Sequence, residues 1–342
     1  MLKIDLFHSG LKLKSPVIAA SSGITETVDQ MLRAEEAGAG AVVMKSYFEN
    51  SNYRIDPTPH FKILRRKLGA YRSDTLYSFE QASEFNAYEY AEEIARTKRR
   101  LNIPVIANID FVTEKGCLQA ADLFAEAGAD ALEVKACPHG ELMASGKNFT
   151  EQIKPIIKKI KSEHKIPVII KLVPQLTDPV KTGILVEKMG ADSLVMFNRF
   201  LGLEIDIEKE APILHGGYAG HGGLWSIHYA LKWLSSLYPE TAIPLIGSGG
   251  AVSGQDIIKY ILSGAFAVEV CTAIILKGYE IITEMNREIK EWMKGKGYKQ
   301  IKEFRGKATQ KIQSLPEIQR GQKVVASINR ELCAGCGRCA RS

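Results

Sequence analysis

A single cysteine stands where the sequence predicts the end of a buried strand. Cys137 lies in the segment EVKACPHG, directly before Pro138. A helical run at residues 116–128 precedes the strand, which is the element order of an α/β domain. A strand end followed by proline and glycine places the thiol at the mouth of such a domain, where it can take part in chemistry. The alternative is an inert cysteine buried at a strand-to-loop junction.

Five other polar residues fall at predicted strand ends. They are three lysines and two asparagines: Lys45, Asn108, Lys135, Lys171 and Asn198. The carboxyl ends of barrel strands meet at one face, so these side chains would converge on one mouth. Because an unpaired, partly buried ammonium group is costly, three lysines at one face require an anionic partner.

Glycine-rich loops indicate that this partner carries a phosphate. Gly249 and Gly250 follow the seventh predicted strand in the run GSGG, and Thr272 follows the eighth. Gly220 lies in a second glycine-rich run, GGYAGHGG. Exposed backbone N–H groups and a helix N-terminus bind phosphate at this place in a barrel. Tight turns that bind nothing are the alternative.

The elements that must position these residues repeat along the chain. Four helical runs end at a glycine, Gly38, Gly128, Gly190 or Gly264, and a run rich in β-branched residues follows each. A glycine at a helix C-terminus supplies the positive φ that other residues adopt poorly. Four further apolar runs alternate with these, so eight strands are predicted to start near residues 16, 41, 104, 131, 167, 193, 243 and 267.

Helical patterns fill most of the gaps, at residues 27–37, 88–101, 149–163, 179–189, 224–237 and 255–263. Eight alternating β/α units predict a TIM (β/α)8 barrel. The alternative, an open doubly wound sheet, would have a GxGxxG turn after the first strand, and ASSG at residues 20–23 is not that turn. Two long connections, residues 46–87 and 198–223, follow strands at the predicted active-site face, where long loops are usually functional.

The composition narrows the class of protein. The chain has 342 residues, 45% of them hydrophobic, and a net charge of +6 that is nowhere concentrated with aromatic residues as in a nucleic-acid interface. No apolar run reaches the roughly 18 residues of a membrane span, and the N-terminus lacks the apolar stretch of a signal peptide. The six cysteines lack the spacing of a secreted disulfide scaffold, which indicates a reducing, cytoplasmic location.

Residues 1 to 310 resemble the dihydroorotate dehydrogenase family of FMN-binding barrels. The motifs that carry the resemblance are LKLKSPVI at 11–18, VMKS at 43–46, EAGADALE at 126–133, CP at 137–138, IKLVPQLTD at 170–178, GSGG at 247–250 and FRGK at 304–307. The resemblance implies that FMN lies across the mouth, held by Ala20, Ser21, Lys45, Ser46, Lys171, Gly220, Gly249, Gly250, Cys271 and Thr272. Among these, Lys171 would stabilise the anionic reduced flavin.

The same resemblance assigns the reacting groups. Cys137 takes the position of the catalytic acid/base, and a thiol with a pKa of about 8.5 suits proton transfer at a carbon next to a developing carbanion. The small-molecule substrate would lie against Ser78, Asn108, Lys135, His139 and Asn198.

A closer likeness is to the flavin subunit of dihydropyrimidine dehydrogenases. It rests on CPHG at 137–140 and VCTA at 270–273, and on the tail. Cys333, Cys336 and Cys339 have the C-x₂-C-x₂-C spacing of a [4Fe–4S] binding run. The fourth cysteine would come one position after Ser342, so we expect either a shortened form of a longer protein or a three-cysteine site.

We therefore divide the chain into a barrel (1–308), a linker (309–330) and an incomplete ferredoxin-like segment (331–342). The resemblance implies that an NAD(P)H-linked partner subunit exchanges electrons with this tail. It also implies a homo-oligomer.

Two positions depart from the pyrimidine-binding pattern. Lys135 and Ser78 stand where the family has asparagine, and only Asn198 is retained. An amide both donates and accepts hydrogen bonds, whereas lysine only donates. We therefore predict reduction or formation of a C=C bond conjugated to a carbonyl in a small polar molecule. The alternatives are dihydroorotate oxidation, a tRNA-dihydrouridine synthase and a non-catalytic electron-transfer scaffold.

Overall fold

The computed structural model describes most of the chain. The described residues are 6–8, 10–69, 71–79, 82–136, 149–213, 217–314, 316–319, 321, 325, 327–337 and 339. They fall into two compact units, Met1–Gln310 and Lys311–Ser342. Within the described part of the chain, no helix is both long and apolar enough to cross a membrane.

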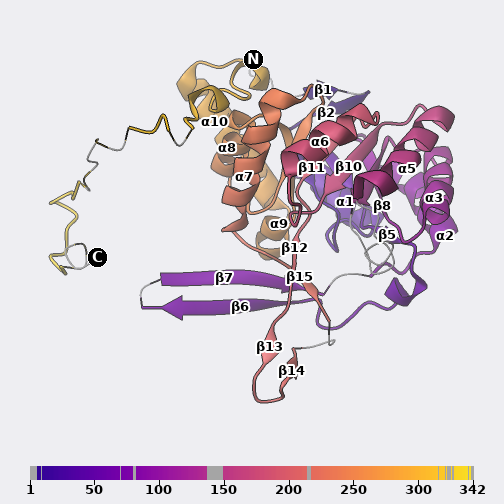
Figure 1. Ribbon diagram of the computed structural model, residues 1–342, viewed down its shortest axis with the longest axis horizontal. Coiled ribbons are helices and arrows are strands. Elements are labelled where there is room, and N and C mark those ends of the chain that lie inside the picture. Colours follow the sequence, from indigo (N-terminus) through magenta and orange to yellow (C-terminus); the bar gives the residue numbers. More distant parts are fainter. Residues whose placement is uncertain are drawn as a thin grey trace. The chain divides into compact units, whose positions relative to one another are not determined.

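The first unit is built around a closed barrel of eight parallel strands. They are β3 (Val17–Ala19), β4 (Ala41–Val43), β8 (Val105–Asp110), β9 (Ala131–Ala136), β10 (Val168–Leu172), β11 (Ser193–Met196), β16 (Leu245–Ser248) and β17 (Ala265–Val270). Each pairs with the next in chain order, and the pairing of β17 with β3 closes the ring (Figure 1). The predicted TIM barrel and its eight strands are confirmed.

Helices surround the barrel (Figure 1). They are α1 (Val28–Glu36), α2 (Ala87–Lys98), α3 (Glu114–Glu126), α5 (Phe149–Glu163), α6 (Pro179–Lys188), α7 (Ser226–Leu237), α8 (Gly254–Leu262), α9 (Thr272–Lys277) and α10 (Glu280–Lys296). Side-chain caps begin several of them, such as the capping boxes at Thr27 and Asn86. The four glycines predicted to end helices all have positive φ, between 93° at Gly38 and 110° at Gly264.

The two long connections form a second, antiparallel sheet beside the barrel. Its strands are β6 (Phe61–Leu68), β7 (Tyr71–Ser78), β12 (Phe200–Gly202) and β15 (Ala219–Gly222), in the order β12-β15-β7-β6. The hairpin of β6 and β7 extends away from the barrel (Figure 1).

The remaining elements are short. They are β1 (Leu6–His8), β2 (Leu11–Leu13), β5 (Tyr47–Phe48), β13 (Ile205–Asp206), β14 (Ala211–Pro212) and the 3₁₀ turns at Ser51–Arg54, Tyr238–Glu240, Ile301–Glu303 and Thr309–Lys311.

The barrel strands are buried on both faces. Every residue of β3, β4, β8, β10, β11 and β17 is buried, which explains why the strands appear as continuous apolar runs. Charged or amide side chains interrupt this apolar interior at five positions: Asn108, Asp110, Glu133, Lys171 and Glu269. Burying polar groups of this kind costs free energy unless they are paired, so their presence indicates a functional site.

Candidate active site

A cavity of about 1180 Å³, counted to its open mouth, lies at the carboxyl ends of the barrel strands. This is the face where barrel enzymes carry their active sites. The residues predicted to hold the cofactor all line this cavity: Ala20, Ser21, Lys45, Ser46, Lys171, Gly220, Gly249, Gly250, Cys271 and Thr272. Ser78, Lys135 and Asn198, which we predicted to contact the substrate, line it too.

Other predicted residues have different places. Asn108 is fully buried and is not part of the cavity wall, because its amide points to Glu133 and donates a hydrogen bond to that carboxylate. Cys137 and His139 lie outside the described residues. Cys333, Cys336 and Cys339 belong to the second unit, where each is exposed.

Backbone geometry explains the glycines after β16. Gly249 and Gly250 have φ values of 112° and 69°, a region that favours glycine. A Cβ atom at Gly250 would lie only 2.6 Å from the backbone nitrogen of Ile227, in the first turn of α7. The loop therefore passes directly against the start of a helix, and both elements line the cavity. Such a cradle of backbone N–H groups suits a phosphate.

Lys45 is held in place from two directions. Its ammonium Nζ lies 2.9 Å from Glu26 Oε1, and its backbone carbonyl accepts a hydrogen bond of 2.9 Å from the hydroxyl of Tyr90. Beside it, the hydroxyls of Ser21 and Ser46 are 3.1 Å apart and link the ends of the first two barrel strands. The side chain is almost completely buried, so Lys45 presents a fixed positive charge at the cavity wall.

Lys171 is paired with two buried carboxylates. Its Nζ lies 3.1 Å from Glu133 Oε1 and also bonds Glu269 Oε2. Burial, and then the neighbouring charge of Glu133, raise the pKa of Glu269 well above its usual value. Burial also acts to raise the pKa of Glu133, but Lys171 outweighs it, and that pKa is lowered. Burial acts to lower the pKa of Lys171, but the two carboxyl groups raise it, so the lysine stays charged.

Lys135 is engaged within the protein. Its Nζ lies 3.2 Å from Asp110 Oδ2 and 4.9 Å from the centre of the Phe48 ring, a cation–π arrangement. Burial lowers the pKa of Lys135, Asp110 opposes this, and the positive charges of Arg199 and Lys171 lower it further. Each of the three strand-end lysines thus has a carboxylate partner within the protein. Among the described residues that line the cavity, four are basic (Lys45, Lys135, Lys171 and Arg199) and one, Glu269, is acidic.

The sequence analysis missed three charged residues of the site. Glu133 and Glu269 stand inside the apolar runs ALEVKA and AFAVEV, where a lone charge among buried neighbours was an available signal. Arg199 follows Asn198 directly and lines the cavity. Its guanidinium donates a 2.9 Å hydrogen bond to the hydroxyl of Ser78, and its stem packs where a Cβ of Gly220 would otherwise lie.

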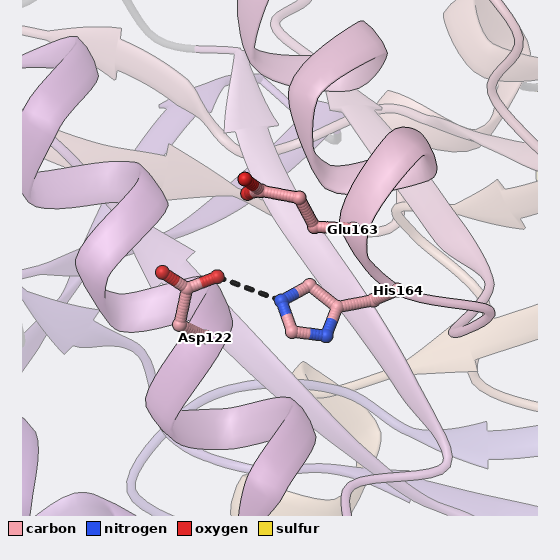
Figure 2. Close-up of side chains that lie close together, drawn as sticks. All are labelled: Asp122, Glu163 and His164. Carbon is pink, nitrogen blue, oxygen red and sulfur yellow. Dashed lines mark hydrogen bonds and ion pairs between the residues drawn. The ribbon is translucent and has the colours of Figure 1, made fainter.

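A second group of ionisable residues lies away from the cavity, on α3 and at the end of α5 (Figure 2). It is the one group among the described residues in which three such side chains come within ligand distance, and it consists of Asp122, Glu163 and His164. His164 Nε2 lies 2.7 Å from Asp122 Oδ1, while Glu163 pairs with Lys159. The carboxylates are partly exposed, so ordinary surface ion pairs account for the group.

The three tail cysteines form no such group in the described part of the chain. The iron–sulfur site therefore stays a prediction.

Comparison with known proteins identifies the family. The model of the dihydroorotate dehydrogenase family matches residues 1–293. The catalytic subunit of dihydroorotate dehydrogenase B (NAD(+)) from Pyrococcus abyssi is 32% identical over 312 residues, which cover 90% of this chain and 99% of that protein. The proteins of the same name from Methanocaldococcus jannaschii and Methanocella arvoryzae are 31% and 33% identical and cover 86% and 80% of this chain.

These relatives support some of the predictions made from the sequence and not others. They confirm an FMN-dependent dehydrogenase that acts on CH–CH groups. They carry the dihydroorotate name, so the closer likeness to dihydropyrimidine dehydrogenase is not supported, and the alternative of dihydroorotate oxidation fits better. On the family match over most of its length, the chain belongs to the dihydroorotate dehydrogenase family.

Proposed function

We propose that this protein is an FMN-dependent oxidoreductase that interconverts dihydroorotate and orotate, or a close analogue with a carboxylate next to the reacting C–C bond. The observation that carries the proposal is the cavity at the barrel mouth, which both the buried lysines and the glycine cradle line. The name shared by the relatives supports dihydroorotate as the first substrate to test.

The residues present suit FMN. Gly249, Gly250 and Thr272 line the cavity and would hold the phosphate, since the absence of a Cβ at Gly250 lets the loop lie directly against the backbone at the start of α7. Lys45 and Lys171 would lie against the ring system, where buried positive charge favours a reduced, anionic flavin. When bound, FMN supplies the hydride acceptor.

The positive charges at the mouth favour a carboxylate substrate. Arg199 and Lys135 both line the cavity, and the family's amide at position 135 is replaced by a donor-only group. Orotate carries a carboxylate and uracil does not, so these cations discriminate between the two rings. Asn198 also lines the cavity and offers both a donor and an acceptor to the ring.

We assign the proton transfer to Cys137. As a base, it would take the proton from one carbon of dihydroorotate while the hydride leaves the neighbouring carbon, and in reverse it would return the proton. The assignment rests on the position of Cys137 after β9, the strand that also carries Glu133 and Lys135.

A redox partner completes the proposal. The relatives are named as catalytic subunits of an NAD(+) enzyme, which supports a separate subunit that exchanges electrons with this one. We further propose that Cys333, Cys336 and Cys339 contribute to a [4Fe–4S] site in a tail that follows the barrel and a linker, and that the barrels associate as a homo-oligomer.

An anaerobic flavin titration tests the function. The protein would be reconstituted with FMN, photoreduced, and mixed with orotate or with uracil while the flavin absorbance is followed. We expect orotate to reoxidise the flavin promptly and uracil to do so much more slowly. The variant Cys137→Ser should photoreduce normally but reoxidise about 10²- to 10⁴-fold more slowly, the usual contribution of a positioned acid or base.

Each other outcome has a distinct meaning. Reoxidation by uracil alone would replace the proposed substrate by a neutral pyrimidine. Reduced flavin that ignores both rings would leave the cofactor in place and refute the substrate class. Protein that cannot be loaded with FMN would remove the central proposal.

A further inference from the structure

Three charged side chains meet inside the barrel, directly at the floor of the cavity. Glu133 on β9, Lys171 on β10 and Glu269 on β17 are all buried, and Lys171 and Glu269 also line the cavity. The ammonium group of Lys171 thus forms ion pairs with two carboxyl groups. If both carboxyl groups were ionised, the trio would carry a net negative charge on side chains that are almost completely buried, which is a costly arrangement.

Two carboxyl oxygens of the trio lack a hydrogen-bond donor within the described part of the chain, and one additional proton shared between them would satisfy both. Glu133 Oε1 accepts from Lys171 and from the amide of Asn108, and Glu269 Oε2 accepts from Lys171. No donor among the described residues reaches Glu133 Oε2 or Glu269 Oε1. Both carboxyl groups bond the same ammonium Nζ of Lys171, so they lie beside each other, and each has one oxygen without a donor in that part of the chain. Two neighbouring carboxyl groups can bond each other only when one of them carries a proton.

We propose that Glu133 and Glu269 share one exchangeable proton beside Lys171, and that this pair sets how many protons the bound flavin takes up when it is reduced. The proposal rests on the FMN site proposed above. With the proton in place the trio is neutral. Without it the trio is negative and opposes a further negative charge in the cavity.

The coupling follows from charge balance. Reduction to the anionic flavin consumes two electrons and one proton and adds one negative charge above the trio. If the pair has already lost its proton, the added charge draws one proton from solvent onto the carboxyl pair. The overall uptake is then two electrons and two protons, whereas a pair that keeps its proton throughout gives two electrons and one proton.

Within the part of the chain that the structure describes, the neighbours of the pair do not supply an alternative proton. β3 contributes only apolar residues beside Glu269, and β16 contributes the hydroxyl of Ser248. On β8 and β9, Asn108 already donates to Glu133, and Lys135 is paired with Asp110.

Among the described residues, most other charged or titratable groups at this end of the barrel have partners of their own. Tyr90 donates its hydroxyl proton to the carbonyl of Lys45, whose own ammonium pairs with Glu26. Arg199 bonds Ser78. Cys271 also lines the cavity, and its thiol is a weak donor at most. His221 also lines the cavity; its Nδ1 has no hydrogen-bond partner among the described residues, and burial lowers its pKa. Burial and the charge of Glu133 raise the pKa of Glu269, in the direction that the shared proton requires.

The first experiment measures the midpoint potential of the flavin as a function of pH, in the native protein and in Glu269→Gln. The amide has the shape of the protonated acid and cannot ionise. In the native protein we expect the uptake to rise from one proton to two per two electrons as the pH rises from neutral to alkaline. In Glu269→Gln it should stay at one. Glu26→Gln, which removes the carboxylate at Lys45 instead, should shift the potential and keep the two-proton region.

An identical proton count in the native protein and in Glu269→Gln at every pH would overturn the proposal. Failure to bind FMN would instead refute the proposed function, and a cofactor-free measurement keeps the two apart. Infrared spectra of the native apoprotein, unlabelled and with ¹³C-labelled glutamate, should show the carbonyl band of a buried, protonated glutamic acid at neutral pH. The absence of a label-sensitive band of this kind would overturn the shared proton without reference to flavin.

Discussion

Gly250 offers a sharp test of the phosphate cradle. In Gly250→Ala the new Cβ would lie 2.6 Å from the backbone nitrogen of Ile227 and 3.0 Å from the carbonyl oxygen of Gly223. An ordinary contact needs about 3.4 Å, so the loop or the start of α7 must move by about 0.8 Å. Hydrogen bonds between N–H and O span only about 2.7–3.2 Å, so a shift of this size breaks one.

The size of the effect follows from that lost bond. A hydrogen bond to a charged group is worth about 1.5–3 kcal/mol, and about 1.4 kcal/mol corresponds to a tenfold change in affinity. We therefore expect Gly250→Ala to weaken FMN binding by about 10- to 100-fold. A residue other than glycine at its φ of 69° adds about 1–2 kcal/mol of backbone strain, which lowers the free energy of unfolding.

A second glycine separates strain from the loss of the cradle. Gly297 also has a positive φ, 76°, but nothing lies within 4 Å of its Cβ position, and it ends α10 away from the cavity. Gly297→Ala should lose stability in a urea titration and bind FMN as the native protein does. Fluorescence quenching of FMN, titrated with each apoprotein, gives the affinities. If Gly250→Ala bound FMN within twofold of the native protein, the phosphate would lie elsewhere.

Three further predictions follow from the charged groups of the site. Lys171→Met should lower the free energy of unfolding by about 3–5 kcal/mol, because it leaves two buried carboxyl groups without their counter-ion. If a urea titration gave a loss below about 1 kcal/mol, the two carboxyl groups would not be buried together. The double variant Lys171→Met/Glu269→Gln should recover part of that loss. Lys135→Asn should lower kcat/KM for orotate relative to uracil by about tenfold, because one ion pair worth about 1.4 kcal/mol is lost. An unchanged ratio in steady-state kinetics would show that Lys135 pairs only with Asp110 and not with the substrate. Finally, burial and Glu133 raise the pKa of Glu269, so the native state holds a proton that the unfolded chain releases. The stability of the apoprotein should therefore fall as the pH rises from the unfolded pKa through the native one, and Glu269→Gln should flatten that part of the curve; equal slopes in urea titrations over that range would contradict the raised pKa.

The sequence by itself determined the barrel and most of its mouth. The alternation of helical runs, glycine C-caps and apolar strands is local information, because helix and strand periods are set by neighbouring residues. Once eight such units are counted, the closure of the barrel brings Lys45, Lys171 and Gly249 to one face without further knowledge. The second sheet was not predicted, since its strands come from two connections more than a hundred residues apart and have no strong alternation.

Only the tertiary structure decided the partners of the charged residues. Lys171 meets Glu133 and Glu269 across sequence separations of 38 and 98 residues. Lys135, which the sequence offered as a substrate contact, lies against Asp110 and the ring of Phe48. Strand order and register place one residue opposite another, and no local pattern encodes register between strands that are distant in the chain. The basic residues at the mouth therefore follow from their positions at the strand ends in the sequence, whereas the proposed shared proton beside Lys171 follows from the way the barrel closes.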